Sequence, residues 1–257
     1  MTLATGRLPL SDHRTRVLEY LRGIALPFTS VAGTIVAEYL STAPERDLLR
    51  PSLVLWAADA CGAPERDALP VAAAFALFDR FMELHDELVE PPEQAGSVAR
   101  WGLGQSLNAG DALYALALRA LAEDVVNADR RIAVASLVAR AVLEAIEGRT
   151  IDVERQARGA RNGLLAQVRS VRRRSAVLTG AALQAGAILG GAPENVVRGF
   201  DRAGRLLDAA SAVPRSDATL AARIALKATA AVGRCVSKKD ALDRFEEAVR
   251  FVAAADH

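Results

Sequence analysis

Five carboxylates stand close together in a stretch that has helical character, at spacings of three and four residues: Asp79, Glu83, Asp86, Glu87 and Glu90. These spacings place side chains on one face of a helix, where like charges repel. A bound divalent cation would offset the repulsion, and Mg²⁺ takes one or two carboxylates together with substrate phosphates. The spacing therefore predicts a magnesium site with Asp86 and Glu90, one turn apart, as ligands. The alternative is a solvated acidic face that Arg80 neutralises in part.

The composition favours close-packed helices over a sheet. Hydrophobic residues make up 51% of the 257 residues and aromatic residues only 5%, so Ala, Leu and Val must supply the core. The net charge of +1 gives no indication of a nucleic-acid partner or an anionic membrane surface. Cys61 and Cys235 have no metal-ligand spacing and fit a reducing compartment. Without a signal-peptide pattern or a membrane-spanning apolar run, we expect a cytoplasmic protein.

Proline and glycine punctuate the chain into helices that would position the carboxylates. After a loose tail at residues 1–10, the acidic stretch is expected to end a long helix over 65–90, which Pro91 and Pro92 stop. Further helices are predicted over 98–123 and 162–190, among others. No alternating run indicates a strand. The prediction is one all-α domain over 1–257, built from about nine helices.

Four segments resemble motifs of the trans-isoprenyl diphosphate synthases, the polyprenyl synthetase family. Residues 49–58, LRPSLVLWAA, resemble a helix start of the form RPxLVLLAA, and residues 84–90, LHDELVE, resemble the first aspartate-rich motif, IHDDxxD. Residues 107–113, LNAGDAL, are nearly identical to a family signature, and residues 147–152, EGRTID, resemble EGQxxDL. The four blocks occur in the family's order.

The resemblance implies an all-α, isoprenoid-synthase-type helical bundle around a central apolar cavity. In active members, two aspartate-rich motifs hold Mg²⁺ ions that bind the diphosphate of an allylic substrate. Its ionisation gives a cation that isopentenyl diphosphate attacks, in a cavity that excludes water. Asp86, Glu87 and Glu90 would then be catalytic, and Asp152 would line the cavity. Members are usually homodimers, and some form heteromers with one inactive chain.

This chain departs from the family pattern at two places. The first motif survives as Asp-Glu-x-x-Glu, but no second aspartate-rich motif follows the helix of Phe200, where Asp208 and Asp217 are single carboxylates. At the expected isopentenyl diphosphate site, Asp47 stands where the family has lysine, which turns attraction for a diphosphate into repulsion.

Three arginines are candidate diphosphate ligands, since arginine binds phosphate with two parallel hydrogen bonds. Arg50 keeps the family's arginine before proline, and Arg174, with Ser175, best matches a family Lys-Thr pair. Arg100 is the nearest candidate for an arginine pair that the family has after the first motif. For Arg174 and Arg100, the alternative is an ordinary position on the protein surface.

Bulky residues before the first motif indicate the depth of any pocket. By resemblance, Phe78, Phe81 and Met82 would form a cavity floor that suits geranyl- to farnesyl-sized chains; the alternative is that they are ordinary core residues. His85 is interpreted as a packing or hydrogen-bonding residue.

Two functions follow from these patterns. One is an enzyme that binds an allylic prenyl diphosphate through Mg²⁺, as a short-chain prenyltransferase or an allylic-diphosphate-ionising enzyme. The alternative is a non-catalytic subunit that modulates an active homologue. A weaker third possibility is a binding protein that holds an isoprenoid or another lipid.

Overall fold

The computed structural model describes residues 11–24, 29–41, 48–88, 96–123, 125, 127–159, 174–213, 217–236 and 239–254. In these ranges every regular element is a helix, which confirms the all-α prediction. The helices are α1 (Ser11–Ile24), α2 (Val31–Ser41), α3 (Leu49–Ala60), α4 (Glu65–Glu87), α5 (Gly96–Trp101), α6 (Leu103–Glu123), α7 (Ala128–Ala157), α9 (Ala176–Leu189), α10 (Glu194–Ser211), α11 (Ala218–Gly233) and α12 (Lys239–Ala254).

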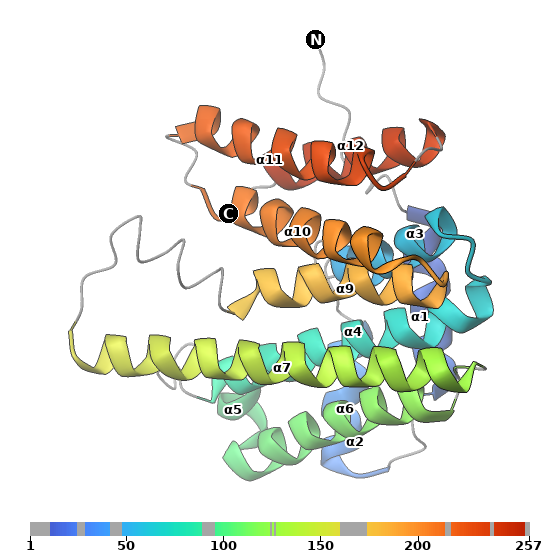
Figure 1. The fold of residues 1–257 in the computed structure, drawn as a ribbon. Coiled ribbons are helices and arrows are strands. Elements are labelled where there is room, and N and C mark those ends of the chain that lie inside the picture. The colour runs from blue at the N-terminus through green and yellow to red at the C-terminus, as the bar shows by residue number, and fades with distance from the viewer. Residues whose placement is uncertain are drawn as a thin grey trace.

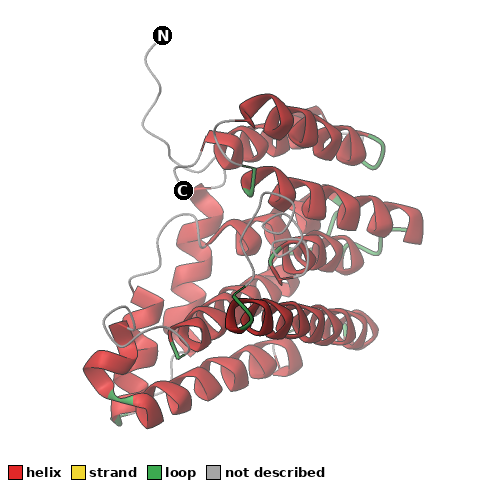
Figure 2. Ribbon diagram, turned by 90° about the vertical axis from the view of Figure 1, so that its left-hand side faces the viewer, coloured by secondary structure: helices red, strands yellow, loops and turns green. Residues whose placement is uncertain are grey.

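The helices pack as a stack with α4 and α9 near its middle (Figure 1). On one side α6 packs against α4, and α2 packs against α6. On the other side α10 packs against α9, and α11 and α12 pack against α10. The long helix α7 packs against α9 and also touches α6, and Figure 2 shows it nearly end-on, in front of the other helices. The helices α3, α4 and α9 contact one another pairwise.

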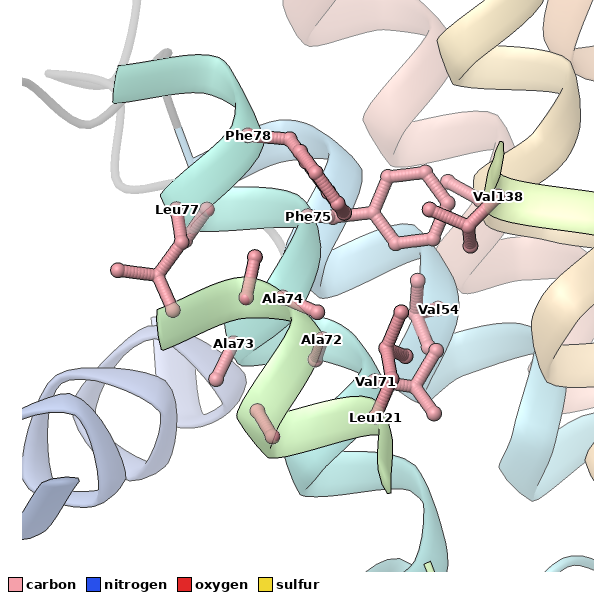
Figure 3. Close-up of a cluster of buried hydrophobic side chains, with 14 of the residues drawn as sticks. Val54, Val71, Ala72, Ala73, Ala74, Phe75, Leu77, Phe78, Leu121 and Val138 are labelled. Atoms are coloured by element: carbon pink, nitrogen blue, oxygen red, sulfur yellow. The ribbon is translucent and has the colours of Figure 1, made fainter. Parts of the chain in front are cut away.

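The larger apolar cluster of the core is organised around α4. Every residue from 71 to 78 is buried, and four of these eight are alanines. Such small side chains let neighbouring helices approach closely, and this explains how a chain with few aromatic residues fills its interior. Figure 3 shows the Phe75 ring directed toward Val138 of α7.

A second apolar cluster joins α3 to the C-terminal helices through Trp56. Its indole is fully buried, with ring centroids 5.6 Å from Phe200 and 5.0 Å from Phe245. The indole N–H donates to the carbonyl of Ala241 at 3.0 Å, so the one polar atom of the ring is satisfied. This contact fixes α12 against α3.

Glycines bring α9 close to both of its neighbours. A Cβ at Gly186 would clash with the Val54 carbonyl and lie 2.6 Å from the Cβ of Ala57, both on α3. A Cβ at Gly204 of α10 would clash with the Thr179 carbonyl of α9. Only glycine permits this approach, which brings polar side chains of α3, α9 and α10 within reach of one another.

Three predicted helices differ in the structure. The helix expected over 98–123 is two helices, because Gly102 between them has a φ of +82° that other residues rarely adopt. The helix expected over 65–90 ends at Glu87, and residues 89–90 lie outside the described ranges. Of the helix expected over 162–190, the structure describes α9, from residue 176. The described part of the chain holds eleven helices, against about nine predicted.

None of the described helices is both long and apolar enough to cross a membrane.

Candidate functional site

Arg50 lies at the centre of a polar cluster between four helices. From α3 its guanidinium pairs with Asp79 of α4 and donates to Ser175, the residue before α9. Its Nε–H donates to Thr179 Oγ1 at 3.0 Å, and Nη2 lies 3.7 Å from Asp208 Oδ1. The Arg50 side chain is 18% exposed, so these protein groups surround most of the guanidinium. Arg50, which the sequence predicted to bind a diphosphate, therefore also holds the helices together.

Asp208 of α10 also belongs to this cluster. Its Oδ1 accepts hydrogen bonds from Ser175 at 3.0 Å and from Thr179 at 2.8 Å. Its Oδ2 is buried and has no hydrogen-bond partner. Asp217, the other single carboxylate in this region, caps α11 by accepting from the Leu220 N–H at 3.2 Å. Asp217 is thus an ordinary helix cap.

The acidic stretch of α4 is dispersed among separate partners. Asp79 pairs with Arg50, Glu83 pairs with Arg80, and Asp86 Oδ1 lies 3.0 Å from Nη2 of Arg149 on α7. The repulsion expected between these carboxylates is therefore offset by arginines. The predicted relief by Arg80 is present, and Arg50 and Arg149 make further contacts of this kind.

Both carboxylate oxygens of Glu87 are engaged by neighbouring segments. The Tyr39 hydroxyl of α2 donates to Oε1, and the Ser97 N–H, in the first turn of α5, donates to Oε2 at 2.7 Å. Burial is the main cause that raises the pKa of the Tyr39 hydroxyl, and the hydrogen bond to Glu87 raises it further. This donor therefore keeps its proton. Glu87 therefore connects the end of α4 to α2 and α5.

On α7, Asp152 lies among arginines. Its side chain is 10% exposed, with Arg174 Nε at 3.6 Å and Arg155 Nη1 at 3.9 Å. Asp152 and Arg149 are three residues apart and share a helix face. The structure thus brings Arg174, Asp152, Arg149 and Asp86 to one region, between the ends of α4 and α9 and the last turns of α7.

Arg100 lies apart from these residues. Its side chain is 59% exposed, Nη1 donates to Glu38 Oε1 at 2.7 Å, and the guanidinium lies 4.6 Å from the centre of the Trp101 ring. This arrangement matches the surface location that the sequence left open for Arg100.

The predicted cavity floor packs against α6. Phe78 is buried, and both Phe78 and Phe81 lie beside Tyr114, with ring centroids 5.5 Å and 5.3 Å away. His85 Nδ1 lies 3.0 Å from the Phe81 carbonyl, and its ring packs on Phe81 at 4.2 Å, as its packing interpretation requires. Met82 is partly buried. The role of Phe78, Phe81 and Met82 as a cavity floor stays a prediction.

In the described part of the chain, the carboxylates of Asp86 and Glu87 face protein groups, and the magnesium site with Asp86 and Glu90 stays a prediction. Asp86 faces a guanidinium and both oxygens of Glu87 accept hydrogen bonds from the protein. Among the described residues, no three His, Cys, Asp or Glu side chains gather where they could hold an ion. Glu90, the other predicted ligand, and Asp47 lie outside the described ranges.

Arg149, like Arg155, is a residue of this region that the sequence interpretation missed. The block at 147–152 reads EGR where the matching family block reads EGQ, so a new positive charge was visible in the motif itself. Its partner was not visible, because Asp86 belongs to another helix.

Comparisons with known proteins agree with the fold and the motifs. Residues 35–210 match the family described as Polyprenyl synthetase. A geranylgeranyl diphosphate synthase from Methanosarcina mazei is 29% identical over 163 residues, which are 62% of this chain and 50% of that protein. A (2E,6E)-farnesyl diphosphate synthase from Mycobacterium bovis is 31% identical over 152 residues, 58% of this chain and 42% of that protein. The chain thus matches about half the length of these curated relatives.

Solved structures share the fold at low sequence identity. Geranylgeranyl pyrophosphate synthetase from Pyrococcus horikoshii superposes with a TM-score of 0.84 at 16% identity, over 96% of this chain and 97% of the other. An FPP/GFPP synthase from Zymomonas mobilis superposes with a TM-score of 0.83 at 17% identity, over 95% of this chain and 97% of the other. Because the family match covers most of the chain and includes the motif blocks, the chain belongs to the polyprenyl synthetase family.

Proposed function

We propose that this chain is a non-catalytic member of its family, one that pairs with an active isoprenyl diphosphate synthase and modulates it. The ion pair between Asp86 and Arg149 supports the proposal, since it places a positive charge against the first carboxylate of the motif that would hold Mg²⁺. Asp208, near the expected second motif, is likewise engaged, in the Arg50 cluster.

An exposed apolar stripe on α7 supports a partner chain. Ile132, Leu143, Ile146 and Val153 are 66%, 67%, 40% and 37% exposed. Their spacings of eleven, three and seven residues place them along one face of the helix. The neighbouring helix α6 exposes Leu103, Leu107 and Leu118. We infer that these exposed apolar side chains on adjacent helices form an interaction surface, which would serve a homodimer as well as a pair with the active synthase.

The test measures turnover with and without an active partner. The lone protein is assayed with Mg²⁺, geranyl or farnesyl diphosphate, and isopentenyl diphosphate. We expect no turnover by the lone protein. When it is co-expressed with a synthase that has both aspartate-rich motifs, we expect co-purification and a changed product length. Turnover by the lone protein that Asp86→Asn abolishes would contradict the proposal.

A short-chain prenyltransferase is the second candidate function. The curated relatives are named as geranylgeranyl and farnesyl diphosphate synthases. In addition, Asp86 and Arg149 are 37% and 22% exposed, so the pair is screened by water and contributes about 1 kcal/mol or less. A diphosphate with bound Mg²⁺ would then separate the pair, and the assay of the lone protein decides between the two functions.

A further inference from the structure

The carboxylates and arginines at the ends of α4 and α7 alternate in space. Asp86 contacts Arg149 at 3.0 Å, and Asp152 contacts Arg174 at 3.6 Å and Arg155 at 3.9 Å. Arg149, Asp152 and Arg155 follow one another at intervals of three residues on α7, so they lie on one side of the helix.

Three guanidinium groups in this region offer N–H donors to an anion. The guanidinium groups of Arg149, Arg155 and Arg174 contact the carboxylates of Asp86 and Asp152. The side chains of Arg149, Arg155 and Arg174 are 22%, 33% and 33% exposed, so a ligand from solvent can reach them. A guanidinium presents five N–H donors in a planar fork, which fits the oxygens of a phosphate.

In such a site, either a metal ion or a guanidinium can join a carboxylate to a phosphate, because both are positively charged. Mg²⁺ joins carboxylates to phosphate oxygens because it is positive toward both. A guanidinium also binds a carboxylate through one edge and a phosphate through another. Arg149 already has one nitrogen on Asp86.

We infer that Arg149 takes the place of a metal ion, and that Arg149, Arg155 and Arg174 bind the diphosphate group of a ligand without Mg²⁺. This rests on the proposed function, because a metal-dependent catalyst needs Asp86 for the ion. Asp86 orients Arg149 in this site, and the bound ligand stays intact.

Calorimetric titration with inorganic pyrophosphate, in EDTA and separately in Mg²⁺, tests the inference. A parallel titration uses a non-reactive thiolodiphosphate analogue of geranyl diphosphate, to separate free pyrophosphate from a prenyl diphosphate. The wild-type protein should bind at least one of them in EDTA. Arg149→Gln should weaken that binding by about tenfold or more, the loss of one charge-assisted contact. The matched control is Arg140→Gln, on an exposed stretch of the same helix beside Ser136, and it should bind as the wild type does.

Three outcomes would overturn the inference: binding of either ligand only when Mg²⁺ is present, no binding of either ligand, or equal affinity of the wild-type and Arg149→Gln proteins in EDTA. The result of the turnover assay does not depend on the results of these binding titrations. A protein that binds in EDTA and also turns substrate over would remove the proposed function and the replacement of the metal by Arg149, but the metal-free binding of diphosphate by the arginines would still hold.

Discussion

At the scale of single residues, Arg50 is the group whose removal should cost the most. The side chains of Asp79 and Asp208 are each 9% exposed, and Arg50 lies between them. Arg50→Met would remove the cation that lies between these two carboxylates, so we expect a loss of about 3–5 kcal/mol in the free energy of unfolding. Urea denaturation measures it.

The control for this prediction is Arg198→Met. Arg198 is 67% exposed and pairs with Glu194 one turn away, so its loss should change stability by about 0.5 kcal/mol or less. Equal losses in the two variants would show that the Arg50 cluster is not a structural clamp.

His13 gives the chain a pH-dependent stability. Burial, then the nearby Arg244 and Arg16, lowers the pKa of His13 below its ordinary value. As pH falls through that ordinary value, the unfolded chain binds a proton that the folded chain resists, so stability should fall from about pH 7 to about pH 5. Urea denaturation at both pH values measures this fall in stability. The fall from about pH 7 to about pH 5 should be smaller for His13→Asn than for the wild type. An equal loss would assign the pH dependence to other groups.

Residue types in the site were predictable, but their partners were not. The spacing and the family block identified Asp86 and Glu87 from sequence alone. Their contacts come from other helices: Arg149 from α7 and Tyr39 from α2. The spacing of residues in a sequence predicts which side chains share a helix face. It does not predict which side chain of a distant helix packs against that face.

At the scale of elements, Gly186 should control how closely α9 approaches α3. A Cβ there would meet the Val54 carbonyl and Ala57, and backbone atoms cannot move aside as a flexible side chain can. Gly186→Ala should therefore destabilise the fold by about 1–3 kcal/mol, although alanine is the better helix former. Thermal unfolding measures the change.

The control is Gly104→Ala in α6, where nothing lies within 4 Å of the added atom. It should be neutral or stabilise by up to about 1 kcal/mol. A destabilisation of the same size in both variants would remove the packing explanation.

Helix ends followed the punctuation of the sequence closely where proline or a cap marks them. The start of α4 after Pro64 and of α10 after Pro193 are examples. The break between α5 and α6 was missed because Gly102 is one of several glycines in that stretch, and only its backbone conformation separates it from Gly110. Gly110 instead lies against His85, where a Cβ would be 2.5 Å from the ring.

At the scale of the whole molecule, the stripe on α7 should govern assembly. Leu143 and Leu226 are almost equally exposed, at 67% and 68%, but Leu226 lies on α11, away from the stripe. We expect the wild-type protein to be a dimer by light scattering, Leu143→Glu to shift it toward the monomer, and Leu226→Glu to leave it dimeric. A monomeric wild type, or equal behaviour of the two variants, would exclude this face as a homodimer interface.

We propose that arginines bind the carboxylates of α4 where a metal would otherwise bind. A crystal structure with pyrophosphate and Mn²⁺ tests this, because anomalous scattering locates the metal. We expect Arg149 to contact both Asp86 and the pyrophosphate, with no metal on Asp86. A Mn²⁺ ion bridging Asp86 and the pyrophosphate, with Arg149 displaced, would contradict it.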